Sequence, residues 1–182
     1  MTIYHFKKGG LLWQSMNRMI YKALTVKQPY ANDLVTVAYQ EDGVNYGIKS
    51  IEVRSRNTHY RGDILICSSA KPVYPHLVSG AALGLVELYD VKRIEDFTED
   101  DWLCTRIPIK KRAEIKSGFG WMMRNPRKVI EVPVKGQLGI YNIPFMEGEI
   151  IPYPQRIFLD KKGYYDIMKS ILDHENKQAG KV

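Results

Sequence analysis

The sequence of 182 residues predicts a single α+β domain that is mainly β: a β-barrel of five to seven strands with short peripheral helices and a C-terminal helix. Short β-prone runs recur between turn residues, and the helical segments between them are brief. Glycines interrupt the longest strand pattern, as the bends of a barrel require. The length suits one domain with a sizeable core.

The N-terminal elements follow from local signals. Residues 1–21 show no clean periodicity and are expected to form an irregular or weakly helical arm. Residues 22–26 are β-prone, and Pro29 presets the start of a short helix over residues 30–35. Residues 35–46, with an acidic turn at their centre, predict a hairpin.

The central strands differ in their patterns. Residues 49–54 alternate strictly, which places Ile51 and Val53 on one face and Glu52 and Arg54 on the other. The run 64–67 is continuously apolar and predicts a strand buried on both faces. Residues 80–91 form another long strand pattern, with glycines at 80 and 84.

The C-terminal half predicts helices at two places. Thr98 and the acids after it predict an N-cap, with a helix that ends before Pro108. Residues 129–134 and 138–141 are expected to be strands joined by a tight turn. A final helix over residues 164–174 is expected to pack on the barrel through one apolar face, formed by Tyr165, Ile167, Met168, Ile171 and Leu172. The expected organisation is an arm (1–21), a barrel domain (22–143) and an extension (144–182).

The net charge of +7 is unevenly distributed. Residues 104–135 carry nine bases against two acids, and such a segment attracts polyanions, of which RNA or single-stranded nucleic acid is the expected partner. A solvated face that only aids solubility explains the same pattern. The nine bases are Arg106, Lys110, Lys111, Arg112, Lys116, Arg124, Arg127, Lys128 and Lys135.

Several function classes are disfavoured. No stretch approaches the roughly 20 apolar residues of a transmembrane helix, and the first 22 residues lack a secretory apolar core, so a cytoplasmic protein without membrane association is expected. The two cysteines and four histidines lack metal-ligand spacing, and no phosphate-binding glycine loop is present. Neither a metal nor a cofactor is expected. The oligomeric state stays open.

Four blocks of sequence together resemble the ASCH domain family, which has a PUA-like barrel and is associated with RNA and modified nucleosides. The blocks are ALTVKQPYANDLV (23–35), GIKSIEVRSRNTHYRGDILICSS (47–69), GAALGLVELYDV (80–91) and FGWMMRNPRKVIEVPVKGQLGIYNI (119–143). The resemblance covers residues 22–143. One departure is an insertion over residues 36–46, which is expected to lengthen a hairpin at the rim and to alter any site geometry that depends on the preceding helix.

The resemblance implies a ligand cleft beside the barrel, lined by Lys49, Glu52 and Arg54. Arg54 suits bidentate contact with a phosphate or a base edge, Lys49 supplies a point charge, and Glu52 can accept a hydrogen bond from an exocyclic amine. A structural ion pair on one strand face explains the same residues.

Further candidate ligand contacts lie nearby in the sequence. Pro29 and Tyr30 begin the short helix, where an aromatic face can stack a base, although Tyr30 also fits a half-buried core position. Ser68, Ser69 and Lys71 follow the buried strand, where ordinary turn chemistry explains them almost as well.

Three functions are compatible with these residues. The first is an RNA-binding or nucleotide-binding module. The second is a small amidohydrolase acting on N4-acetylcytidine, because similar family members use a lysine, a threonine three residues later and a distant glutamate. Here Lys49 and Glu52 would be catalytic, but Glu52 stands at the threonine position, which removes the hydroxyl nucleophile. The third is a protein-interaction adaptor that uses the arm and the extension.

Overall fold

The computed structural model describes residues 17–157 and 159–179, and the side chains as far as residue 174. Six strands form one mixed sheet in the order β4-β7-β6-β5-β1-β8, within the predicted five to seven strands. Strands β1 and β5 pair in parallel, and all other neighbours are antiparallel. The strands are β1 (Arg18–Val26), β4 (Ile51–Arg54), β5 (Gly62–Ser68), β6 (Ala81–Arg93), β7 (Phe119–Pro133) and β8 (Ile140–Met146).

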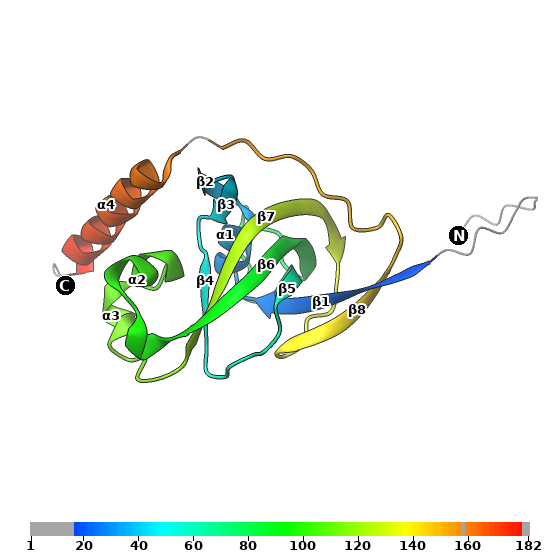
Figure 1. Cartoon of the computed structure of the whole chain (residues 1–182), viewed down its shortest axis with the longest axis horizontal. Coiled ribbons are helices and arrows are strands. Elements are labelled where there is room, and N and C mark those ends of the chain that lie inside the picture. The colour runs from blue at the N-terminus through cyan, green and yellow to red at the C-terminus, as the bar shows by residue number, and fades with distance from the viewer. Residues whose placement is uncertain (1–16, 158, 180–182) are drawn as a thin grey trace, which may run out of the picture.

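The sheet bends strongly around a short helix, α1 (Tyr30–Val35) (Figure 1). The two longest strands, β6 and β7, change register three times along their shared ladder. Such bulges increase twist and bend a sheet. Gly84 lies on β6 where a Cβ atom would be 2.7 Å from the Arg127 carbonyl oxygen and 2.9 Å from the Val35 side chain. The absence of a side chain at Gly84 therefore lets β6 approach both β7 and α1.

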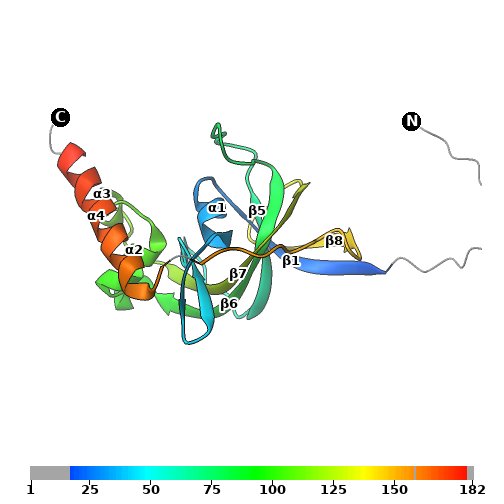
Figure 2. The ribbon, with the colours of Figure 1, turned by 90° about the horizontal axis from the view of Figure 1, so that it is seen from above.

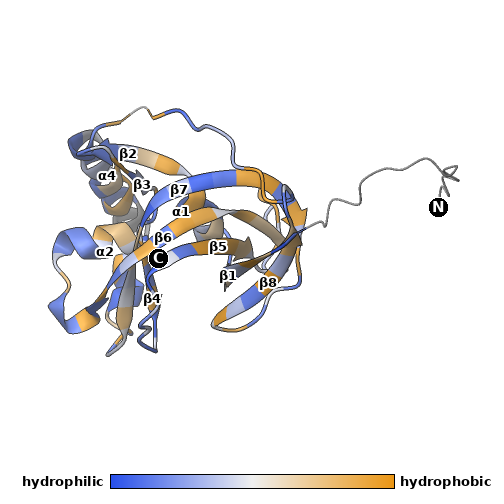
Figure 3. Ribbon diagram, turned by 45° about the vertical axis from the view of Figure 1, so that its right-hand side comes forward, coloured by the Kyte–Doolittle hydropathy of each residue, from blue (hydrophilic) through white to orange (hydrophobic). Residues whose placement is uncertain are grey.

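The central strand β5 is buried on both faces, as its apolar run predicts. Ile64 and Ile66 pack with α1 in one hydrophobic cluster, whereas Leu65 and Cys67 pack in a second cluster with Tyr141 of β8. All four β5 residues have 0% exposure. Figure 3 shows hydrophobic stretches along β5 and β6, where these clusters meet.

Elements with strong local signals form as predicted. Helix α1 spans residues 30–35, and the hairpin β2 (Val37–Glu41) and β3 (Val44–Gly47) turns at Asp42 and Gly43. Helix α2 (Glu99–Thr105) begins after Thr98, whose hydroxyl accepts a hydrogen bond from the Asp101 N–H in a reciprocal capping box. Two short helical segments flank α2: η1 (Ile94–Asp96) and α3 (Ile109–Arg112).

Two predicted elements are wrong in their pairing or bounds. Residues 18–21 are part of strand β1 and not of an arm, while residues 1–16 lie outside the described residues. The expected tight hairpin of residues 129–141 does not form, because β8 pairs with β1 and residues 129–133 are the end of β7. Seven residue pairs join β8 to β1, a longer ladder than the four residues 138–141 could form in the predicted hairpin.

The C-terminal helix α4 (Lys161–Ala179) packs on the β2–β3 hairpin and on α2, at the end of the molecule away from β8 (Figures 1 and 2). Among residues 161–174 of this helix, the buried hydrophobic side chains are Tyr164, Met168 and Leu172. The predicted apolar face was wrong for Ile167 and Ile171, which are 46% and 37% exposed. The buried apolar stripe of α4 is narrow because the helix packs on a two-stranded hairpin and not on the six-stranded sheet.

The connector between β8 and α4 runs back along β7. The backbone N–H of Ile130 donates to the Ile151 carbonyl at 3.0 Å, and the N–H of Tyr153 donates to the Lys128 carbonyl at 3.0 Å. No helix among the described residues is both long and apolar enough to cross a membrane.

Candidate functional site

The Gly47–Lys49 segment is fixed between α1 and α2. A Cβ atom at Gly47 would lie 2.7 Å from the Lys49 carbonyl oxygen and 2.9 Å from that of Leu34, so only glycine fits this close approach. The Lys49 N–H donates to the Asp33 carbonyl of α1 at 3.1 Å, and the Ser50 N–H donates to the Cys104 carbonyl of α2 at 3.1 Å. The backbone that leads into β4 therefore has a rigid frame on both sides.

The Lys49 ammonium group is buried and has a full set of acceptors. It donates to the carbonyl oxygens of Ile51 at 2.7 Å and Thr105 at 2.5 Å, and it lies 3.2 Å from Oε2 of Glu52. It also lies 5.2 Å from the ring centroid of Tyr30, a cation–π distance. An ammonium group has three N–H donors, so all of them are used within the protein.

The electrostatics of Lys49 follow from this position. Burial lowers the pKa of Lys49, and the nearby Glu52 carboxylate opposes that shift. Thr105 provides its acceptor at the C-terminal end of α2, where the helix carbonyls favour a cation. Lys49 is thus buried behind Glu52 and Tyr30, and its ammonium group orients both side chains.

Glu52 and Arg54 lie on the same face of β4, as the alternating pattern predicts. Both side chains are more exposed than that of Lys49. The Glu52 side chain is 12% exposed, and its Oε1 lies 3.2 Å from an Arg54 Nη2 nitrogen. The same nitrogen donates to the Thr25 carbonyl of β1 at 3.2 Å. The buried Nε of Arg54 has no hydrogen-bond partner among the described residues. Arg54 therefore spans from β4 to β1 and keeps an unused donor.

A hollow of about 320 Å³, called the cleft below, opens at these residues. It brings together four of the predicted ligand contacts, Tyr30, Glu52, Arg54 and Ser69. Burial raises the pKa of Tyr30. The remaining lining residues are Thr25, Val26, Lys27, Gln137, Leu138 and Gly139.

Four predicted contacts lie outside this lining. Lys49 is beneath it, and Pro29 is half-buried at the start of α1. Ser68 is 0% exposed, and its hydroxyl bonds with the backbone of Ala81, donating to the carbonyl and accepting from the N–H. Lys71 is exposed in the loop after β5, where its carbonyl accepts a hydrogen bond from the Ser69 hydroxyl at 2.6 Å.

Thr25 is a site residue that the sequence reasoning missed. Its hydroxyl accepts a hydrogen bond from the Gln137 N–H at 3.1 Å and lies 3.1 Å from the Tyr141 hydroxyl. A Cβ atom at Gly136 would lie 2.7 Å from the Thr25 side chain. Thr25 therefore anchors the β7–β8 loop (134–139) at the cleft, and the closely spaced glycines at 136 and 139 were the only local signal of that contact.

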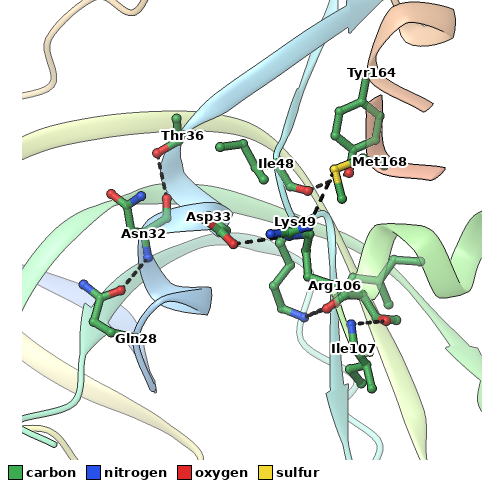
Figure 4. Close-up of polar contacts among 12 residues, drawn as sticks. Gln28, Asn32, Asp33, Thr36, Ile48, Lys49, Arg106, Ile107, Tyr164 and Met168 are labelled. Atoms are coloured by element: carbon green, nitrogen blue, oxygen red, sulfur yellow. Dashed lines mark hydrogen bonds and ion pairs between the residues drawn. The ribbon is translucent and has the colours of Figure 1, made fainter. Parts of the chain in front are cut away.

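The nine bases of residues 104–135 are distributed over three parts of the fold. The first group is on or beside α2 and α3. Arg106 lies 3.5 Å from the Asp33 carboxylate, and Arg112 lies over the Trp102 ring and donates to the Ile107 carbonyl. Figure 4 shows Arg106 between Asp33 and Met168. The other members are Lys110, Lys111 and Lys116.

The second group is on β7, where acids from other strands neutralise much of the charge. Arg124 forms a two-point contact with Glu87 of β6, and Arg127 pairs with Asp63 of β5 at 2.5 Å. Lys128 donates to the Asn32 side chain, and burial lowers the pKa of Lys128. Lys135 alone lies in the β7–β8 loop beside the cleft.

No group of three or more His, Cys, Asp or Glu side chains that could hold a metal ion occurs among residues 17–157 and 159–179. The two cysteines, Cys67 and Cys104, are buried and free. Burial raises the pKa of Cys67 to about 11, so this thiol stays protonated and unreactive near neutral pH.

Comparisons with known proteins bear on the family of the chain, through a family model that matches part of the sequence. No curated protein sequence matches the chain. Among solved structures, a mutant of the ZmASCH protein from Zymomonas mobilis is similar, with a TM-score of 0.48 and 12% identity, covering 62% of this chain and 75% of that one. The family model described as the ASCH domain matches residues 24–133, which is more than half of the 182 residues. The chain therefore belongs to the ASCH domain family, one of the PUA-like families.

Proposed function

We propose that this protein binds RNA or nucleotides and receives one unpaired base in the cleft lined by Tyr30, Glu52 and Arg54. The observation that carries the proposal is the position of Glu52: a carboxylate at the wall of an open hollow, held from beneath by Lys49 and from the side by Arg54. A carboxylate in this position accepts a hydrogen bond from an exocyclic amine such as N4 of cytosine.

The neighbouring residues supply the other elements of base recognition. The Arg54 side chain is 31% exposed and lines the cleft, and arginine suits a carbonyl oxygen, a ring nitrogen or a phosphate. Tyr30 lines the same hollow and offers an aromatic ring for stacking. The lining holds two cations, Lys27 and Arg54, against one acid, Glu52, which favours an anionic ligand.

The contacts of Lys49 weigh against the amidohydrolase alternative. A lysine that acts on substrate needs a free donor or acceptor toward it, whereas Lys49 gives its three donors to Ile51, Thr105 and Glu52. The binding function is therefore the one that these contacts support best.

The test measures the affinity for cytidine, uridine, cytidine monophosphate and short single-stranded RNA by calorimetry and fluorescence anisotropy. Arg54→Ala and Glu52→Gln should each weaken binding by about 1 to 3 kcal/mol, the usual loss for one charge-assisted contact with a base. The matched control is Arg61→Ala, which removes an exposed arginine paired with Asp90 and should have no effect.

The same samples test for catalysis. Incubation of wild type with N4-acetylcytidine should release no cytidine above a heat-killed control. Cytidine release that is lost in Glu52→Gln would make the enzyme reading primary. Equal affinity of wild type, Arg54→Ala and Glu52→Gln for every ligand would refute the cleft as the binding site.

A further inference from the structure

A second hollow adjoins the cleft and is larger, at about 760 Å³. We call it the loop hollow, because the loops after β5 and after β7 form most of its wall. It shares four lining residues with the cleft, Thr25, Ser69, Gln137 and Leu138. The two spaces therefore meet along one wall, and both volumes lie within the range of ligand-binding hollows.

The lining of the loop hollow suits a nucleotide whatever the identity of its base. Lys135 is its one charged residue, and it contains no acid. Gly80 and Gly136 expose backbone, whereas Pro133, Val134 and Leu138 give apolar surface. A cation can hold a phosphate, and an aliphatic surface beside it can pack against a neighbouring base without selecting its identity.

Leu138 lies where the two hollows meet, and its side chain is 99% exposed. Single exposed apolar residues are common on protein surfaces, but this one projects at the wall shared by two hollows. The opposite loop, after β5, also presents apolar side chains to solvent: Val73 is 72% exposed and Val78 is 45% exposed.

The β7–β8 loop is held in place before any ligand binds. The Val134 N–H donates to the Gly80 carbonyl at 2.9 Å, which joins the two loops that form the hollow. Gly136 and Gln137 lie on Thr25, whose carbonyl also accepts from Arg54 of the cleft. One residue of β1 thus positions both the cleft and the loop hollow, and a preformed site binds with a smaller entropy cost.

We propose that the loop hollow receives the nucleotide next to the one in the cleft, so that the ligand is a single-stranded polynucleotide and not a free nucleoside. The inference rests on the proposed function of the cleft. Lys135 would supply charge for the linking phosphate, and Leu138 would pack against the base beside it. A duplex is disfavoured because its stacked base pairs cannot enter two hollows that lie on either side of one wall.

The experiment compares the affinity of the protein for cytidine monophosphate, a cytidine dinucleotide, a longer cytidine single strand and a duplex. We expect the dinucleotide to bind about tenfold more tightly than the monophosphate, because the second base gains apolar contact with Leu138 and the linking phosphate gains a charge-assisted contact with Lys135. Lys135→Ala and Ala70→Glu change residues that line the loop hollow and not the cleft. Ala70→Glu should remove the tenfold gain and leave the affinity for the monophosphate unchanged. Lys135→Ala, which removes the charge beside the linking phosphate, should reduce the gain and leave the affinity for free cytidine unchanged.

The matched control is Lys169→Ala, which removes an exposed lysine on α4 and should keep the gain. Circular dichroism of each variant checks the fold, which these exposed substitutions should leave intact. The loop hollow is refuted as a subsite if the monophosphate binds and needs Arg54 while the dinucleotide binds no more tightly, or if Lys135→Ala and Ala70→Glu keep the full gain. Equal binding of duplex and single strand also overturns it. Absence of all nucleotide binding would instead overturn the cleft, and with it this inference.

Discussion

Replacing Lys49 by Met should destabilise the protein, because the structure makes this lysine part of the scaffold. The substitution removes the donor to two carbonyl oxygens, Ile51 and Thr105, and one of the two cations beside Glu52. Removing one partner of a buried ion pair costs about 3 to 5 kcal/mol. Methionine avoids the desolvation cost that lowers the pKa of Lys49, which offsets part of this loss. We expect a net loss of about 3 kcal/mol, a large part of a typical domain stability of 5 to 15 kcal/mol.

Urea unfolding followed by circular dichroism measures this loss. The midpoint should fall while the denaturant slope stays the same, because the surface exposed on unfolding is unchanged. Glu52→Gln provides the partner for a double-mutant cycle. The double variant Lys49→Met with Glu52→Gln should lose less stability than the sum of the two single losses. The reason is that the glutamine at position 52 is neutral, so no buried charge is left without a partner.

The ligand affinity separates the scaffold role from direct contact. In Lys49→Met, ligand binding should weaken only because Glu52 and Tyr30 are no longer held in position by the Lys49 ammonium group. The affinity should be measured without denaturant, where the variant is folded. A variant with wild-type stability and no ligand binding would refute the reasoning, because that result requires Lys49 to touch the ligand itself.

Three further results are expected. Gly47→Ala should lower the free energy of unfolding by about 1 to 3 kcal/mol in urea titrations, because its Cβ would overlap two backbone carbonyls; wild-type stability would contradict the close approach. Burial raises the pKa values of Tyr39 and Tyr164 above the ordinary 10.0, so their contribution to stability is complete below pH 10 and is lost as the pH rises above it. Urea midpoints measured on both sides of pH 10 check this, and a midpoint that rises with pH would contradict it. Changing Lys110 and Lys111 to Ala should reduce the salt dependence of RNA affinity by about 0.7 per lysine on logarithmic axes if they contact phosphates, and an unchanged slope would make α3 a solvated face.

Local signals account for the parts of the fold that the sequence predicted. Helix α1 follows a proline, the β2–β3 turn contains Asp42 and Gly43, and α2 begins at a capping box that needs only Thr98 and Asp101. The run at 64–67 predicted a strand buried on both faces because it is short, continuously apolar and bounded by turn residues, and all four residues are 0% exposed in the structure. Each of these signals lies within one element.

Long-range pairing accounts for the parts of the fold that could not be predicted from the sequence. Strand β8 pairs with β1, more than 100 residues earlier, and nothing in either segment specifies that partner. The first half of β7 did not read as a strand because bulges break its alternation and because Arg124 and Arg127 resemble a solvated basic run. Their acids, Glu87 and Asp63, come from β6 and β5. Charge counted along the chain therefore overstated the positive charge of this surface.

The candidate site divides in the same way. Alternation in β4 placed Glu52 and Arg54 on one face, and both line the cleft. Alternation did not reveal that Lys49 is buried, because its acceptors include a carbonyl of α2, 56 residues later. Thr25 was missed for the same reason, since its role depends on Gln137.

The C-terminal helix lies outside the residues matched by the ASCH model, yet it supports the floor of the cleft. The Tyr164 hydroxyl of α4 donates to the Ile48 carbonyl at 2.6 Å, one residue before Lys49 (Figure 4). Met168 contacts Arg106, which lies beside the Asp33 carboxylate, and the Asp33 carbonyl holds the Lys49 N–H. Two chains of contact thus lead from α4 to the backbone of Lys49. The extension consequently contacts the backbone segment that carries Lys49, and it does not line the cleft itself.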